Sequence, residues 1–156
     1  MALAPSKTDV RRAIRYVLNN SAYVTAWLAG GNDAGRTYTK QIIAANANVP
    51  VSEMGIVISI ATIAPETEEV YEDCCQWYFC TFTVWVYSVG QADDLADNLL
   101  TACEEGIKDW GPICLVVAEG REVECRQWRV VNRGSDQPAS GMWRLPLTMT
   151  CLTMYK

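Results

Sequence analysis

The sequence predicts an α+β domain in which two α-helices pack on one face of a mostly antiparallel β-sheet. Its 156 residues fit one compact domain. Hydrophobic residues make up 50% of the chain and charged residues 20%, which is enough for a sizeable core. Two segments have the apolar period of a helix, and several others have the alternation or β-branched composition of a strand. We therefore expect residues 1–156 to form a single domain.

The first helix follows an N-cap signal at Ser6, with the carboxylate of Asp9 three residues later. Apolar side chains then recur at i, i+3, i+4, i+7 and i+8: Val10, Ala13, Ile14, Val17 and Leu18. A shorter helical segment, residues 21–28, is expected to end before the Gly30-Gly31 pair.

Residues from about 30 to 54 show no clear periodicity, and Gly, Asn and Ala dominate them. Loops of that length in a compact domain are commonly functional or become ordered on a partner. We therefore expect a long irregular loop at about 30–54, with Arg36, Tyr38 and Lys40 as candidate contact residues. Its glycine-rich start lacks the spacing of a phosphate-binding loop.

Two strands are predicted on either side of an acidic segment. The first is the β-branched run 56–63, which ends before Pro65, and the second is residues 77–89. Because residues 77–89 are largely apolar at both alternating sets of positions, we expect that strand to be covered on both faces. The segment between them predicts a solvated hairpin connection with five carboxylates and no base: Glu66, Glu68, Glu69, Glu72 and Asp73.

The second helix is predicted from a stripe that runs from Ala92 to Trp110 and ends at Gly111-Pro112. Asp93, Asp94 and Asp97 lie near its N-terminal end, where the helix dipole favours carboxylates. Three further strands are expected at residues 113–118, 122–131 and 142–154. In the last of them, Pro146 favours an edge position or a bulge.

The charge is distributed unevenly along the chain. The net charge is −5, yet residues 66–119 carry −11 whereas residues 1–20 and 120–156 carry +3 each. Such polarity suits head-to-tail association of subunits, with Asp93, Asp94 and Asp97 facing Arg126 and Arg129 as interface candidates. The alternative is a fold that interleaves these segments and cancels the charge within one subunit.

No catalytic or metal-binding constellation is found in the sequence, and no cofactor is expected. The chain has no histidine, which excludes Ser-His, Cys-His and HExxH chemistry. Its seven cysteines are odd in number, lie mostly in apolar runs and include no CxxC pair, so we expect free thiols rather than disulfides or a zinc site. A set of arginines near Trp128 and Trp143 resembles a single-stranded nucleic-acid platform, although tryptophans of a sheet are more simply explained as core: Arg126, Arg129, Arg133 and Arg144.

The order of elements resembles the bacteriophage tail terminator (tail completion) proteins. The resemblance rests on five segments: RRAIRYVLNNSAYVTAWLAG, IVISIATI, WYFCTFTVWVYS, GQADDLADNLLTACEEGIKDW and GMWRLPLTMTCLTMYK. In that family an aromatic strand leads through a short turn into a helix of the type A-x-x-L-A-x-x-L, as at Ala92, Leu95, Ala96 and Leu99. The resemblance is one of pattern over nearly the whole chain.

The resemblance implies a structural protein of the virion, assembled in the host cytoplasm, with no enzyme activity. It implies a ring, most simply a homohexamer, that caps the tail tube, ends its polymerisation and joins the head or neck. Its partners would be its own copies, the tail tube protein and a neck or head-completion protein, with DNA passing through the lumen without specific binding and no membrane involved. The candidates for a surface that faces a partner or the lumen are Glu66, Glu68, Glu69, Glu72 and Asp73. Alternatives are a neck or head-closure (connector) protein, or a small ligand- or nucleic-acid-binding α+β module.

Overall fold

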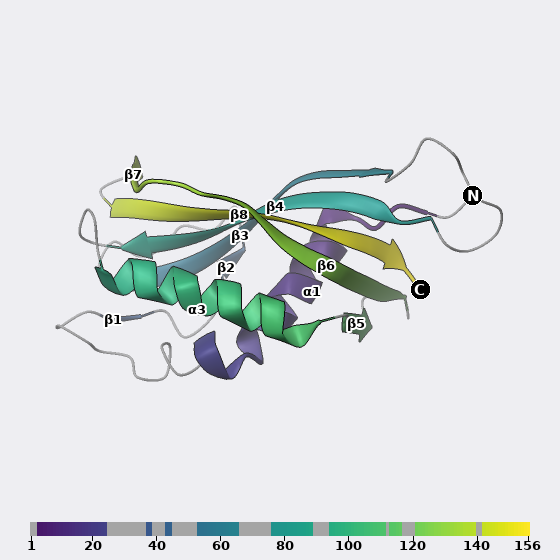
Figure 1. The fold of residues 1–156 in the computed structure, drawn as a ribbon, viewed down its shortest axis with the longest axis horizontal. Helices are drawn as coiled ribbons and strands as arrows, with labels where there is room; N and C mark the ends of the chain where they lie inside the picture. Colours follow the sequence, from purple (N-terminus) through teal and green to yellow (C-terminus); the bar gives the residue numbers. More distant parts are fainter. Residues whose placement is uncertain are drawn as a thin grey trace.

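The computed structural model describes residues 3–24, 37–38, 43–44, 53–65, 76–88, 94–111, 113–116, 121–139 and 142–156. Their elements follow the chain in this order: α1 (Lys7–Asn19), β1 (Thr37–Tyr38), β2 (Ile43–Ala44), β3 (Glu53–Pro65), β4 (Tyr78–Ser88), α3 (Asp94–Trp110), β5 (Ile113–Val116), β6 (Glu122–Arg133), β7 (Gln137–Ala139) and β8 (Met142–Tyr155). The described strands form one sheet in the order β1-β3-β4-β8-β6-β5, with β2 beside β3 and β7 beside β8. All pairings except those of β1 and β2 are antiparallel, which confirms the predicted α+β class. Figure 1 shows the twisted sheet with α1 and α3 beside it.

Helix α1 forms where its sequence signals predict. The Ser6 Oγ accepts a hydrogen bond from the Asp9 N–H at 3.1 Å, as an N-cap should. All five residues of the predicted apolar stripe are buried. Tyr155 then ties this helix end to the sheet, because its hydroxyl donates to Asp9 at 2.5 Å and accepts the Ser6 N–H at 3.1 Å.

Strands β3 and β4 form the predicted hairpin. They pair antiparallel from Gly55 opposite Tyr87 to Pro65 opposite Tyr78, with a register shift between Ile60 and Thr62. The connecting residues 66–75, and with them the five lumen candidates, lie outside the described residues. The hairpin is therefore confirmed, and the placement of its acidic side chains stays a prediction.

The stretch expected to be irregular, about 30–54, contains strand segments that its composition did not suggest. β1 pairs parallel with the start of β3, at Glu53 and Met54, and β2 pairs parallel with Val57 and Ile58. The candidates Arg36 and Lys40 lie outside the described residues, and only the backbone of Tyr38, in β1, is described.

Strand β8 occupies the centre of the sheet, so the expectation of an edge position from Pro146 was wrong. The strand pairs with β4 on one side and with β6 and β7 on the other. Pro146 is tolerated there because its carbonyl accepts from the Gly134 N–H at 3.2 Å, on the side where the β6 ladder has just ended at Arg133. The N and C=O of a strand residue point to the same side, so the missing proline N–H falls at this gap.

The core lies between the helices and one face of the sheet. It combines the apolar stripes of α1 and α3 with alternate residues of four strands, among them Ile58, Phe82, Met149 and Cys125. α3 contributes Leu99, Leu100, Cys103 and Ile107, all fully buried. Both helices thus bury their apolar sides on the same face of the sheet, as predicted.

Candidate functional site

The face of the sheet opposite α1 and α3, here called the helix-free face, carries the most unusual set of side chains. Because Cys80, Phe82, Val84 and Val86 point into the core, the alternate residues of β4 point to the other face. Antiparallel partners share a face, which assigns the even-numbered residues of β8 and several residues of β6 to it as well. Its members include Trp77, Phe79, Thr81, Thr83, Trp85, Tyr87, Arg126, Arg129, Arg144, Thr148, Thr150 and Leu152.

The prediction that β4 is covered on both faces was wrong. Phe79 is 44% exposed, and Trp77, Trp85 and Tyr87 are only partly buried. The helices that the structure describes bury their apolar stripes on the other side of the sheet. Among the described residues, arginine side chains cover the tryptophans of this face.

Two tryptophans carry a guanidinium stacked over the ring. The Arg144 Cζ lies 4.0 Å from the Trp85 ring centroid, and the Arg126 Cζ lies 4.1 Å from that of Trp77. Such cation–π contacts contribute about 0.5–2 kcal/mol each, depending on desolvation. They also place positive charge directly above aromatic surface.

The arginines have further partners of their own. Arg144 Nη1 donates to the Tyr87 hydroxyl at 3.5 Å, and Arg126 Nη2 donates to Glu124 Oε1 at 2.5 Å. The buried Nε of each arginine has no hydrogen-bond partner in the described structure. Arg126, a predicted interface residue, is therefore already paired within its own subunit.

A belt of threonines separates the two stacked pairs. Thr83 lies opposite Thr148, and their Oγ1 atoms are 3.2 Å apart, while Thr81 lies opposite Thr150. These short polar side chains line the middle of the helix-free face, where Thr81, Thr83 and Thr148 are partly buried and Thr150 is buried.

A β-bulge in β6 places Arg129 at the end of this belt. Arg126 lies opposite Leu152 and Arg129 opposite Thr150, so two residues of β6 face one residue of β8. Gln127 adopts a φ of 56° there. The bulge turns Trp128 into the core, where it meets the Phe82 ring edge-on at 6.1 Å, and leaves Arg129 exposed on the helix-free face.

This bulge corrects the proposed nucleic-acid platform. Trp128 is part of the core side and donates its Nε1–H to the Gly111 carbonyl at 2.9 Å. The arginines nearby on the other face therefore do not interleave with it. They combine instead with Trp77 and Trp85 of the neighbouring segment.

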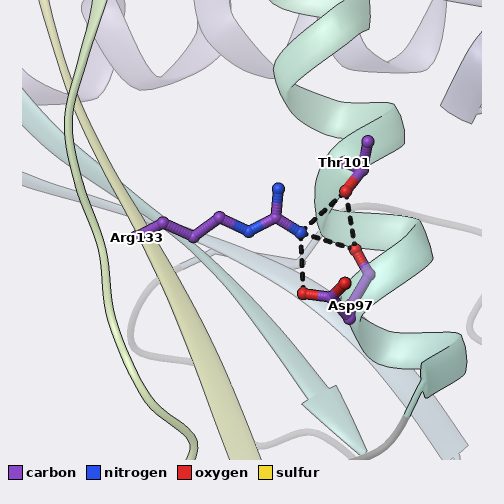
Figure 2. A network of polar contacts seen from close by, with 3 residues as sticks. All are labelled: Asp97, Thr101 and Arg133. Carbon is purple, nitrogen blue, oxygen red and sulfur yellow. Dashed lines mark hydrogen bonds and ion pairs between the residues drawn. The ribbon is translucent and has the colours of Figure 1, made fainter.

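The acidic interface candidates of α3 behave differently from one another. Asp97 Oδ1 accepts from Arg133 Nη2 at 2.8 Å, and the same nitrogen reaches the Asp97 carbonyl at 2.9 Å and the Thr101 hydroxyl at 2.7 Å (Figure 2). This contact joins the end of β6 to α3 and occupies Asp97 within the subunit. Asp93 lies outside the described residues, and for Asp94 only the backbone is described.

The described cysteines are free and buried: Cys80, Cys103, Cys125 and Cys151. Burial raises the pKa of Cys103 to about 12. Hydrogen bonding to Cys125 and to Cys80, followed by burial, raises the pKa of Cys151. Within the described part of the chain, no three Cys, Asp or Glu side chains are grouped so that they could hold a metal ion, and no helix is long and apolar enough to span a membrane.

Sequence reasoning named Arg144 only as part of the nucleic-acid platform and missed Trp77 and Trp85 as partly exposed residues of the same face. Their signal was present: Trp77, Phe79, Trp85 and Tyr87 alternate along one segment, and Arg126 and Arg144 lie on strands that pair nearby. Large apolar residues with this alternation are equally typical of a buried strand, so the sequence pattern alone could not separate the two.

Comparisons with known proteins add little to this description. No family model matches the chain, and no curated protein matches it. Ten chains of solved structures match it. One of them aligns over 97% of both chains with 15% identical residues and a TM-score of 0.46, and its name states no activity, ligand or partner. A similarity of this degree carries no argument about what the chain does.

Proposed function

We propose that this chain is a tail terminator of a bacteriophage, which assembles as a ring on the end of the tail tube, stops its polymerisation and forms the joining surface to the head or neck. The helix-free face is the observation that carries the proposal. It exposes Phe79 on the same face as tryptophans that carry stacked arginines. Trp, Tyr and Arg are the residues enriched at the energetic centres of protein interfaces.

The order of elements also supports this function. A helix, a β-hairpin, a second helix and a C-terminal group of antiparallel strands succeed one another as the family resemblance implied. Within the described residues no three Cys, Asp or Glu side chains are grouped as for a metal ion, and one sheet face exposes Phe79 and Arg129. Both features suit a protein whose role is assembly.

A single-stranded nucleic-acid-binding module is the second candidate, because arginines and aromatic residues share one sheet face. Two observations weigh against it. The chain carries a net charge of −5, which opposes phosphate binding. The guanidinium groups already cover one side of the Trp77 and Trp85 rings, where a base would stack.

Electron microscopy of the purified protein, alone and mixed with tail tubes, tests the proposal. We expect rings, tube ends closed by a ring, and tubes of uniform length. Phe79→Ser should weaken this assembly, whereas Leu3→Ser is a control because Leu3 is also exposed, at 65% against 44%, and precedes α1. The circular dichroism spectra of both variants should match that of the unsubstituted protein.

Three outcomes would contradict the proposal. If the protein leaves tube ends bare at every concentration, it is not a tail terminator. If it binds emptied or filled heads but not tubes, the neck or head-closure function is correct. If it binds an oligonucleotide tightly at physiological salt while remaining a monomer, the nucleic-acid-binding module is correct.

A further inference from the structure

We propose that the helix-free face of one subunit docks on the C-terminal half of α3 in a second copy of this chain. This inference rests on the proposed ring and names the surfaces that form it. It keeps Arg129 from the interface expected from the sequence and departs from it at Asp97 and Arg126, which already have partners within the subunit.

The docking patch on the helix-free face is centred on Arg129 and Phe79. Along the row through Arg129, the register partners are Thr150, Thr81 and Thr62, so no carboxylate neighbours it on the described strands. The Arg129 side chain is exposed and has no hydrogen-bond or ion-pair partner among the described residues. The patch therefore offers one unpaired positive charge on the same face as an exposed aromatic ring.

The opposing patch on α3 has the complementary character. Glu105 and Asp109 are exposed, lie one helical turn apart and have no ion-pair partner in the described structure. Beside them Trp110, 36% exposed, packs on Tyr16, 42% exposed, with ring centroids 5.9 Å apart. This patch thus combines unpaired negative charge with an exposed aromatic pair.

The two patches are of similar size. Phe79 and Arg129 lie two strand spacings apart across the sheet and two residues apart along it, or about 12 Å. On α3, Asp109 precedes Trp110 directly and lies about 100° from it around the helix axis, whereas Glu105 lies about 7.5 Å away along the axis and about 140° around it. One contact can therefore place Phe79 against the Tyr16–Trp110 pair while the long Arg129 side chain reaches the side of the helix that bears Asp109.

The position of the patches explains why the contact would be head-to-tail. α3 packs on the core side of the sheet, and the Arg129 patch lies on the other side, so each subunit carries the two surfaces on opposite sides. Contact between different surfaces is heterologous and builds rings when the rotation closes. A face-to-face pair would instead bring two arginine-bearing patches together, and like charges disfavour that contact.

A charge swap measured by sedimentation velocity tests the inference. Arg129→Glu should weaken self-association about tenfold or more, and Glu105→Lys with Asp109→Lys should do the same. All three substitutions in one chain restore opposite charges at every interface, so association should return to within about threefold of the unchanged protein. Lys7→Glu is the control, because Lys7 is exposed on α1 outside both patches.

The possible results separate the inference from the proposed function. If rings form but Arg129→Glu leaves them unchanged, or if the combined variant associates no better than either parent, the docking surfaces are wrong and the ring stands. If the unchanged protein neither self-associates nor closes tail tubes, both proposals fail. If Arg129→Glu instead abolishes binding of an oligothymidylate probe, the occupant of this face is nucleic acid and the inference is overturned.

Discussion

Replacing Gly106 by alanine tests how closely α3 packs against the start of the next helical segment. A Cβ at Gly106 would lie 2.4 Å from the Ser21 Oγ and 2.9 Å from the Ser21 Cβ, both too close for a real contact. Alanine gains about 1 kcal/mol over glycine in helix propensity, whereas overpacking costs about 1–3 kcal/mol. A change of the Ser21 rotamer cannot move its Cβ, so we expect a net loss of about 1–2 kcal/mol in the free energy of unfolding.

Thermal and urea unfolding measure this loss. In a domain of this size 1 kcal/mol corresponds to about 2–4 °C, so the Tm should fall by about 2–8 °C, with an unchanged urea m value. Ser21→Gly removes both obstructing atoms. In that background Gly106→Ala should become stabilising by about 1 kcal/mol, because only the helix propensity term remains. If Gly106→Ala is already stabilising in the unchanged chain, the two segments do not approach as closely as described.

Three further predictions concern the bulge, the core thiols and the contact between β6 and α3. Gln127→Asn should keep the free energy of unfolding, whereas Gln127→Val should lose about 1–2 kcal/mol in urea unfolding, because a β-branched residue is strained at positive φ. Cys103 should resist alkylation by iodoacetamide at pH 8 in the folded protein, because burial raises its pKa to about 12. The stability that the neutral thiol contributes is present below pH 9 and is lost as the pH rises from 9 towards 12. Arg133→Met should speed amide hydrogen exchange in the first two turns of α3 about threefold, because it removes the contacts to Asp97 and Thr101.

Each of these three predictions has a control or an outcome that would contradict it. Equal stability of the Asn and Val variants would mean that Gln127 does not hold a left-handed backbone. Alkylation of Cys103 at the rate of an unfolded chain would place the thiol outside the core, and mass spectrometry after denaturation should still find seven free thiols. Arg12→Met is the control for Arg133, because its pair with Asp9 is longer, at 3.9 Å, and lies on α1; equal exchange in both variants would remove the role assigned to Arg133.

Sequence patterns predicted most of the architecture because the helices follow strong periodic signals. The N-cap at Ser6 and the stripe from Val10 to Leu18 are local features, and all of them are present in the structure. The antiparallel hairpin of β3 and β4 could also be predicted from the sequence, because two β-branched or aromatic runs flank a polar connection. Local chemistry alone decides these elements.

The remaining features depend on contacts between residues that are distant in the sequence. The bulge at Gln127 reverses the faces of the following residues, so a regular period of two assigns Trp128 to the wrong side of the sheet. Pro146 lies in a central strand only because the β6 ladder ends beside it. The sequence predicted that both faces of β4 are buried, because nothing in the sequence indicates that an arginine of one strand stacks on a tryptophan of another.

The central position of β8 has a consequence for the order in which the protein folds. β4 and β6 have no ladder with each other, and each pairs with β8, which follows both in the chain. While a ribosome is still synthesising residues 142–155, the β3–β4 hairpin and the β5–β6 pair can form, but they cannot join. The hydroxyl of Tyr155 that secures the start of α1 arrives later still. Until then the nascent chain exposes two incomplete sheet fragments, so its solubility during synthesis depends on how quickly this one strand is inserted between them.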